Sequence, residues 1–235
     1  MIAECGFLYS FGHRFGGKAM SRWYRLLKPM LLRFREKRAH AIRERFPEIE
    51  TLRVLDLGGS LHFWEEVGHI LKPASVTIMN IAVNGQSLGE VAGESDRARI
   101  ILYDGKQIPY GDKEIDLLIC NSVMEHVAPA ERPALAREIG RVAKRYVIQV
   151  PALEFPIEPH QVAPFVHWLP RKAGRALSAV TLYGLVNGRE GAVAMFDEVQ
   201  MIGKREFGRL FPAASIVTER TFGMPKSYLA FGNAA

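Results

Sequence analysis

The stretch TLRVLDLGG, residues 51–59, decides the fold class, because it is a short apolar run that ends in an acid and two glycines. A run this apolar fits a strand that is buried on both faces of a parallel sheet. Gly58 and Gly59 let the backbone turn sharply and approach a ligand closely. The stretch therefore predicts the first strand of an α/β sheet, with a ligand-binding turn at its carboxyl end.

Strands and helices alternate after this first strand. Further strands are expected at 75–81, 98–103, 114–120, 145–150, 214–220 and 226–232, and helices at 62–71, 129–142 and 204–211. Such alternation indicates a parallel sheet with right-handed crossovers. The last two strands must pair antiparallel, because a parallel pair needs a crossover of about a dozen residues or more. The predicted fold is α/β: a Rossmann-like, seven-stranded, mostly parallel sheet with one antiparallel C-terminal strand and helices on both faces.

The positive charge of the chain is concentrated at its N-terminus. The 235 residues carry a net charge of +6, and residues 1–50 contain 11 Lys and Arg against 5 Asp and Glu. We expect residues 1–50 to form a basic helical lid or appendage, and residues 51–235 to form the main domain with an insertion at about 151–200. Two interpretations of the basic helix stay open: a packing helix with a solvated basic face, and a lid or membrane-surface helix that contacts acidic headgroups. The balanced charge of the main domain argues against specific nucleic-acid binding.

Composition also bears on location. Cys5 and Cys120 form neither a metal pattern nor a disulfide framework, which favours a reducing compartment. No apolar stretch approaches the roughly 20 residues that span a bilayer, and the start of the chain shows no signal peptide. A cytoplasmic protein is expected, with peripheral membrane contact through the basic N-terminus as an open alternative; the oligomeric state is not predicted.

Four motifs and the terminal strand pair form a recognisable set. The motifs are VLDLGG (54–59), MN (79–80), LYDGKQIPY (102–110) and EIDLLICNSVMEHV (114–127). Together they resemble the class I S-adenosylmethionine-dependent methyltransferases, and within that family the type 11 group. The resemblance covers about residues 50–150 and 200–235. It implies transfer of a methyl group from S-adenosyl-L-methionine (SAM) to a small-molecule or lipid- or sugar-linked acceptor. The family usually has Asp-x-Gly-x-Gly-x-Gly, and this chain lacks the later glycines.

The resemblance implies a SAM site at the carboxyl ends of the strands. Asp56 would help orient the ammonium of the methionine moiety, and Gly58 and Gly59 would line the path of the methionine and ribose. Asn80 stands where the family commonly places an acid on the ribose hydroxyls. An amide can accept one hydrogen bond and donate another there, so we expect binding to survive this difference.

The remaining implied cofactor contacts involve the adenine and the sulfonium. Asp104 would accept a hydrogen bond from the adenine amino group, and the Gly105 N–H would meet a ring nitrogen. Asn121 and Ser122 would lie beside the sulfonium and the acceptor.

His126 and His160 are the candidate catalytic residues. An acceptor hydroxyl of high pKa needs a base, and histidine titrates near neutrality. For His126 the alternative is a helix-start or loop histidine that packs on the cofactor lid, and Glu125 is expected to be structural.

The proline-rich segment PIEPHQVAPFVHWLP (156–170) contains His160 and His167, together with Glu158. Their spacing is not specific for a metal and no cysteine supports one, so no metal site is expected. Roles in the acceptor pocket and purely structural roles stay open for both histidines.

Two other functional classes are alternatives to a methyltransferase. A nicotinamide-dependent oxidoreductase is disfavoured, because the loop after the first strand reads GGSLHFW and lacks the G-x-G-x-x-G fingerprint. A non-catalytic SAM-binding or scaffold protein of the same fold stays an alternative, and turnover would distinguish it from an enzyme.

Overall fold

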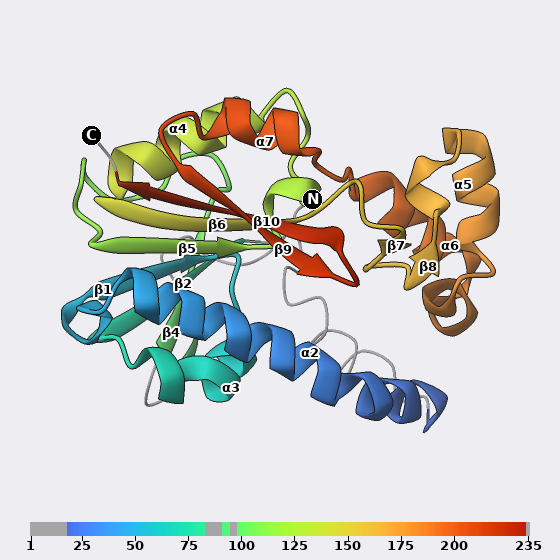
Figure 1. Cartoon of the computed structure of the whole chain (residues 1–235), viewed down its shortest axis with the longest axis horizontal. Helices are drawn as coiled ribbons and strands as arrows, with labels where there is room; N and C mark the ends of the chain where they lie inside the picture. The colour runs from blue at the N-terminus through green and yellow to red at the C-terminus, as the bar shows by residue number, and fades with distance from the viewer. Residues whose placement is uncertain (1–17, 83–90, 95–97, 234–235) are drawn as a thin grey trace. The chain divides into compact units, whose positions relative to one another are not determined.

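The computed structural model describes residues 18–82, 91–94 and 98–233 (Figure 1). Its helices are α2 (Lys18–Arg45), α3 (Leu61–Leu71), α4 (Arg132–Val142), α5 (Arg171–Ser178), α6 (Leu182–Glu198) and α7 (Lys204–Leu210), with 3₁₀ turns η1 (Ile49–Thr51), η2 (Met124–His126) and η3 (Val166–Trp168). Its strands are β1 (Arg53–Leu57), β2 (Ser75–Ile81), β3 (Val91–Glu94), β4 (Ala98–Tyr103), β5 (Leu117–Asn121), β6 (Arg145–Pro151), β7 (Ile157–Glu158), β8 (Ala163–Pro164), β9 (Ser215–Thr221) and β10 (Met224–Asn233).

The main sheet has the strand order β3-β4-β2-β1-β5-β6-β10-β9. Strand β1 pairs parallel with β2 and β5, and β2 pairs parallel with β4. Strands β9 and β10 pair antiparallel. The predicted Rossmann-like fold is therefore confirmed. The sequence analysis missed β3, a short edge strand that pairs antiparallel with β4 and makes the sheet eight-stranded.

The chain divides into two compact units. The first unit comprises Met1–Asn121, Arg137–Val147 and Asn233–Ala235, and the second comprises Ser122–Ala136 and Ile148–Gly232. The first unit thus holds α2, α3 and strands β1 to β5. The second unit holds η2, the small β7–β8 hairpin and helices α5 to α7.

In the first unit, β1 forms because its residues are buried on both faces. Val54, Leu55 and Leu57 are at most 2% exposed, as expected for a central strand of a parallel sheet. The Ser60 hydroxyl accepts a hydrogen bond from the Phe63 N–H and so caps the start of α3. Lys72 takes the left-handed conformation that ends α3, before β2 begins at Ser75. This order returns the chain to the same edge of the sheet for each parallel strand.

The basic helix α2 packs on α3 within the first unit. Arg35 pairs with Glu66, Arg43 donates to the Ile70 carbonyl, and Ile42 is fully buried. The later residue of α2 contacts the later residue of α3, so the two helices point in the same direction. The 17 residues before Arg35 span about 25 Å, whereas α3 begins only about 8 Å before Glu66. The N-terminal half of α2 therefore extends past the start of α3, toward the carboxyl ends of the strands (Figure 1). This direction suits the lid interpretation, which stays a prediction.

The second unit gives structure to the segment predicted as an insertion. Residues 151–200 contain α5 and α6, and the Thr181 hydroxyl caps α6 by accepting from the Gly184 N–H. Gly174 in α5 lies against the Phe196 ring, so this close approach of the two helices requires a residue without a side chain. Among the described residues, no helix has the length and apolar character needed to cross a membrane.

Candidate functional site

Polar side chains follow or end four neighbouring strands of the first unit. Asp56 lies in β1, Asn80 in β2 and Asn121 at the end of β5, and Asp104 follows β4 directly. The strand order β4-β2-β1-β5 puts these four positions side by side at the carboxyl edge. Ligands bind at this edge in open α/β sheets. The structure thus brings together the residues that the sequence analysis assigned to one cofactor.

Asp56 is held under the glycine turn. It is 1% exposed, and its Oδ2 accepts a hydrogen bond of 2.8 Å from the Trp64 indole N–H. Gly58 has a φ of 74°, which favours glycine, and its N–H donates to the Met79 carbonyl. A Cβ on Gly59 would lie 1.9 Å from the Asp56 carboxylate. Glycine is therefore required at the two positions for different reasons: at Gly58 because of its backbone angle, and at Gly59 because a side chain would clash with Asp56.

Burial raises the pKa of Asp56 to about 7, against a smaller lowering by the Trp64 hydrogen bond. The pKa in the folded protein is higher than in the unfolded chain. The stability that the neutral carboxyl contributes is therefore complete below about pH 4 and is lost as the pH rises through 7. When the pH is raised from 5 to 8, we expect the free energy of unfolding of the wild type to fall by about 2–3 kcal/mol more than that of Asp56→Asn. The asparagine keeps an acceptor for Trp64 but does not ionise. Urea unfolding of both proteins at the two pH values measures this difference; equal losses would contradict it.

Asn80 and Asp104 make local contacts that shape the same edge. The Asn80 amide donates to the Gly59 carbonyl at 3.3 Å and so ties the glycine turn to β2. The Asp104 Oδ1 accepts from the Lys106 and Gln107 N–H groups at 2.8 and 3.0 Å, and these bonds lower the pKa of Asp104. Gly105 has a φ of 77°, and a Cβ there would meet the Ile81 side chain at 2.7 Å. The turn after β4 is thus built around a charged, exposed Asp104.

Asn121 carries an unusual buried acceptor. Its Oδ1 is buried and has no hydrogen-bond partner within the described part of the chain. A buried acceptor without a partner costs about 1–3 kcal/mol, so a donor from a bound ligand would be favourable there. Ser122, the next residue, belongs to the second unit; it has a φ of 53° and its hydroxyl donates to Gln149.

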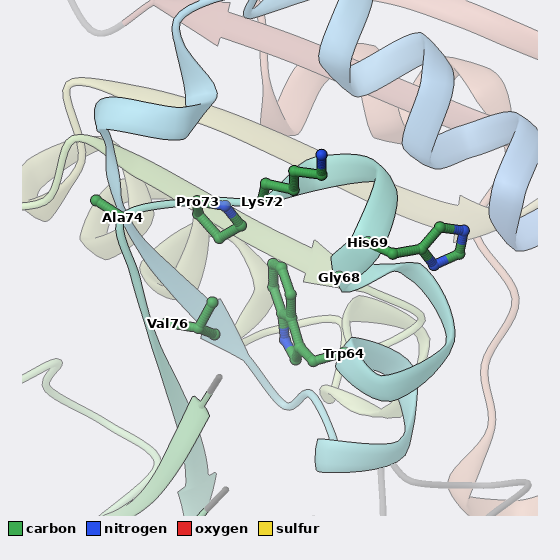
Figure 2. Close-up of a pocket in the computed structure, with 7 residues that line it drawn as sticks. All are labelled: Trp64, Gly68, His69, Lys72, Pro73, Ala74 and Val76. Atoms are coloured by element: carbon green, nitrogen blue, oxygen red, sulfur yellow. The ribbon is translucent and has the colours of Figure 1, made fainter. Parts of the chain in front are cut away.

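A pocket of about 570 Å³ lies elsewhere in the first unit. Figure 2 shows its lining residues, with the Trp64 ring turned toward Pro73 and Val76 and the His69 ring directed away. Lys72, Pro73 and Ala74 precede β2, so this pocket is near the amino end of that strand, away from Asn80. Trp64 therefore separates two regions: its ring lines the pocket and its N–H reaches Asp56.

The two candidate catalytic histidines lie together in the second unit. The rings of His126 and His160 are 5.0 Å apart and nearly perpendicular. The Nδ1 of His126 is 3.2 Å from Glu198, and the Nδ1 of His160 is 2.6 Å from Glu158. Burial disfavours the charged form of His160, but the charge and hydrogen bond of Glu158 outweigh it and the pKa of His160 is raised. A catalytic role for either histidine stays a prediction.

Arg132 holds the loop that carries His126. It is 1% exposed, and its Nε donates to the Met124 and Val127 carbonyls at 3.1 and 3.0 Å. Its Nη1 pairs with Glu206 at 2.7 Å. These bonds fix both ends of the η2 turn, which the sequence analysis did not anticipate.

The middle of the chain matches a known family. Residues 55–146, from β1 to the start of β6, match the family model described as a methyltransferase domain. Residues 55–146 are of the methyltransferase-domain type. This match confirms the family predicted from the motifs. A search of the curated proteins gives no match.

Solved structures share the fold of the methyltransferase domain at low sequence identity. Magnesium protoporphyrin IX methyltransferase (ChlM) from Synechocystis PCC 6803, solved with bound SAH, has a TM-score of 0.52 and 13% identity, covering 92% of this chain and 95% of its own. The mitomycin 7-O-methyltransferase MmcR has a TM-score of 0.52 and 13% identity, covering 97% of this chain and 60% of its own. The pyocyanin biosynthetic protein PhzM has a TM-score of 0.51 and 13% identity, covering 97% and 62%. The chain thus spans less than two thirds of the lengths of MmcR and PhzM.

Three residues that contact predicted site residues or their loops were missed from the sequence. Trp64, Glu198 and Arg132 each contact a predicted site residue or its loop. Trp64 follows Asp56 by eight residues in the helix after the glycine turn, which is a usable signal. Glu198 lies 72 residues from His126, and no local pattern could have joined them.

Proposed function

We propose that the protein transfers a methyl group from SAM to a small-molecule or lipid- or sugar-linked acceptor. The observation that carries this proposal is the row of polar groups at the carboxyl ends of β4, β2, β1 and β5, inside the region that matches the methyltransferase family. Calorimetry with SAM and with SAH tests the cofactor. Binding of neither molecule at millimolar concentration would reject the site.

The residues of the first unit fit this cofactor. SAM supplies an electrophilic methyl group when bound, so the protein has mainly to hold and orient it; such positioning can supply about 7–11 kcal/mol. The Gly58–Gly59 turn lets the backbone approach the ligand closely. The outward carboxylate of Asp104 suits the adenine amino group, and the partnerless Asn121 Oδ1 suits a donor on the ligand. Because the Asp56 Oδ2 accepts from Trp64, its Oδ1 is the oxygen that we assign to the methionine ammonium.

Asp104→Asn is expected to weaken SAM binding about 5- to 150-fold, or about 1–3 kcal/mol. The asparagine Oδ1 can still accept from the Lys106 and Gln107 N–H groups, so the turn is preserved. The other oxygen becomes an NH₂ group, which cannot accept from the adenine amino group. Calorimetry of both proteins measures the change. Asp112→Asn is the control, since Asp112 lies in the following loop and is bonded to Arg141; equal affinities of all three proteins would argue against the adenine assignment.

We assign contact with the acceptor to aromatic side chains of the segment 156–170. The Phe165 and Trp168 rings are 5.3 Å apart and are 52% and 49% exposed. Exposed aromatic rings suit an apolar or sugar-bearing molecule. We assign a lid role to the basic α2 helix of the first unit, and its charge would favour an anionic or membrane-bound acceptor.

Turnover separates this enzyme from a non-catalytic binding protein of the same fold. The protein is incubated with SAM and with panels of phenols, glycosides and lipid-linked sugars, and SAH is quantified by mass spectrometry. We expect SAH to form with an acceptor and not without one. Tight SAM binding with no SAH from any panel would favour the scaffold alternative.

A further inference from the structure

Two buried histidines of the second unit are each oriented by a carboxylate. His126 Nδ1 faces Glu198, and His160 Nδ1 faces Glu158. The side chains of His126 and His160 are each 4% exposed. A histidine that binds a metal through one ring nitrogen almost always donates from the other to a carboxylate, a carbonyl or water. Both histidines therefore have the arrangement that presents Nε2 as a ligand.

Both histidines lie close to Glu125. The His160 Nε2 is 3.9 Å from the Glu125 Oε1. One ligand atom each from Glu125, His126 and His160 lies within 4.8 Å of the other two. Glu125 is fully buried, and neither of its carboxylate oxygens nor the His126 Nε2 has a hydrogen-bond partner among the described residues. Three ligand-type groups thus converge on one point, and the Glu125 carboxylate and the His126 Nε2 lack a hydrogen-bond partner among the described residues.

The negative charge of the carboxylates in the cluster would also be stabilised by a cation. Glu125 and Glu158 are buried, and Glu198 is half-buried. The guanidinium of Arg132, which holds the η2 turn, is already paired with Glu206. Buried charges are normally paired or coordinated to a metal, since an isolated buried carboxylate is very unfavourable. Glu158 is paired with His160, whereas the Glu125 carboxylate has no hydrogen-bond partner among the described residues, so a cation beside Glu125 would compensate its charge.

We propose that Glu125, His126 and His160 bind a divalent transition-metal ion of the zinc class. Two imidazoles and one carboxylate suit zinc or a similar ion, whereas magnesium and calcium prefer oxygen ligands throughout. Ligand bonds of about 2.0–2.2 Å place tetrahedral ligands about 3.4 Å apart, so the groups have to close by about 1 Å. This inference goes beyond the proposed methyl transfer, and binding of the ion does not depend on it.

The proposal changes the role of the two histidines. An Nε2 atom that binds a metal cannot accept a proton from an acceptor, so His126 and His160 are ligands and not bases. Three protein ligands are also the number found in catalytic zinc sites, where the fourth position takes water or a substrate oxygen. Glu158 and Glu198 become positioning residues that hold the imidazoles.

Metal binding is tested on the tag-free, full-length protein after removal of metal with a chelator. Zinc is titrated against a chromophoric competitor, and cobalt(II) is added separately because its visible absorption depends on its ligands. We expect one zinc per chain with a dissociation constant of micromolar or below, and no competition from excess magnesium. Glu125→Gln and His160→Gln should each weaken zinc binding at least 10-fold and change the cobalt spectrum.

Two controls exclude other zinc ligands. His167→Gln changes a histidine of the same unit whose Nε2 contacts the Leu153 carbonyl, and Cys5→Ser removes a thiol; both should bind zinc as the wild type does. If a cluster variant fails to fold, thermal unfolding of the wild type is the test instead. Zinc should raise the melting temperature of the wild type, and magnesium should not. Absence of stoichiometric zinc binding, or wild-type affinity in folded Glu125→Gln and His160→Gln, overturns the proposal. SAM binding is measured in the same samples, so failure of the metal site is distinguishable from failure of the methyltransferase proposal.

Discussion

Replacing Arg132 with methionine is expected to lower the free energy of unfolding by about 3–5 kcal/mol. Arg132 is buried and donates to the Met124 and Val127 carbonyls while pairing with Glu206. Methionine fills a similar volume but leaves the carbonyls and the carboxylate without their donor. Chemical denaturation followed by circular dichroism measures the loss.

The control for this prediction lies on the same helix. Arg137 is exposed in α4, so Arg137→Met should change stability by no more than about 0.5 kcal/mol. A loss below about 1 kcal/mol in Arg132→Met would mean that the η2 turn does not depend on this side chain.

Gly59→Ala is the second large effect, with an expected loss of about 2–4 kcal/mol in stability and at least 10-fold in SAM affinity. The new Cβ would lie 1.9 Å from the Asp56 Oδ2 and 2.2 Å from its Cγ. The carboxyl cannot move aside easily, because it is buried and bonded to Trp64. The alanine therefore has to displace either the glycine turn or the Asp56–Trp64 pair. Denaturation and calorimetry measure the two losses.

Gly140 is the matched control for Gly59. A Cβ at Gly140 meets nothing within 4 Å, and the residue lies inside α4. Gly140→Ala should therefore stabilise the protein, by about 0.5–1 kcal/mol. A double-mutant cycle with Asp56→Ala adds a direct test of the contact: the double variant should lose less than the sum of the two single losses. Additive losses would show that the clash is not the cause.

The sequence predicted most of the first unit because its signals are local. The buried run at 53–57 reads as a strand on composition alone, and the predicted strands at 75–81 and 98–103 agree with β2 and β4. The polar residues at the strand ends could be grouped without coordinates, since parallel strands place their carboxyl ends at one edge. β3 was missed because its four residues, VAGE, carry no β-branched or alternating pattern beyond Val91.

The sequence was less informative about the second unit. Five prolines between Pro151 and Pro170 indicated an irregular segment, and the helices α5 and α6 beyond it were not predicted. α6 contains Gly184, Gly188 and Gly191, which weaken the helical signal. Packing overrides that weakness: Gly184 lies against the Ser178 and Ala179 backbone, where a side chain would clash.

The sequence by itself determined the α/β fold, the row of polar residues at the strand ends and the similarity to methyltransferases, because each depends on the order of residues along short segments. Only the tertiary structure decided what those residues contact. It joined Asp56 to Trp64 and placed Glu125, His126 and His160 together across 35 positions of the chain. Hydrogen-bond direction, burial and unused ligand atoms arise when distant segments meet, so no spacing rule along the chain could specify them.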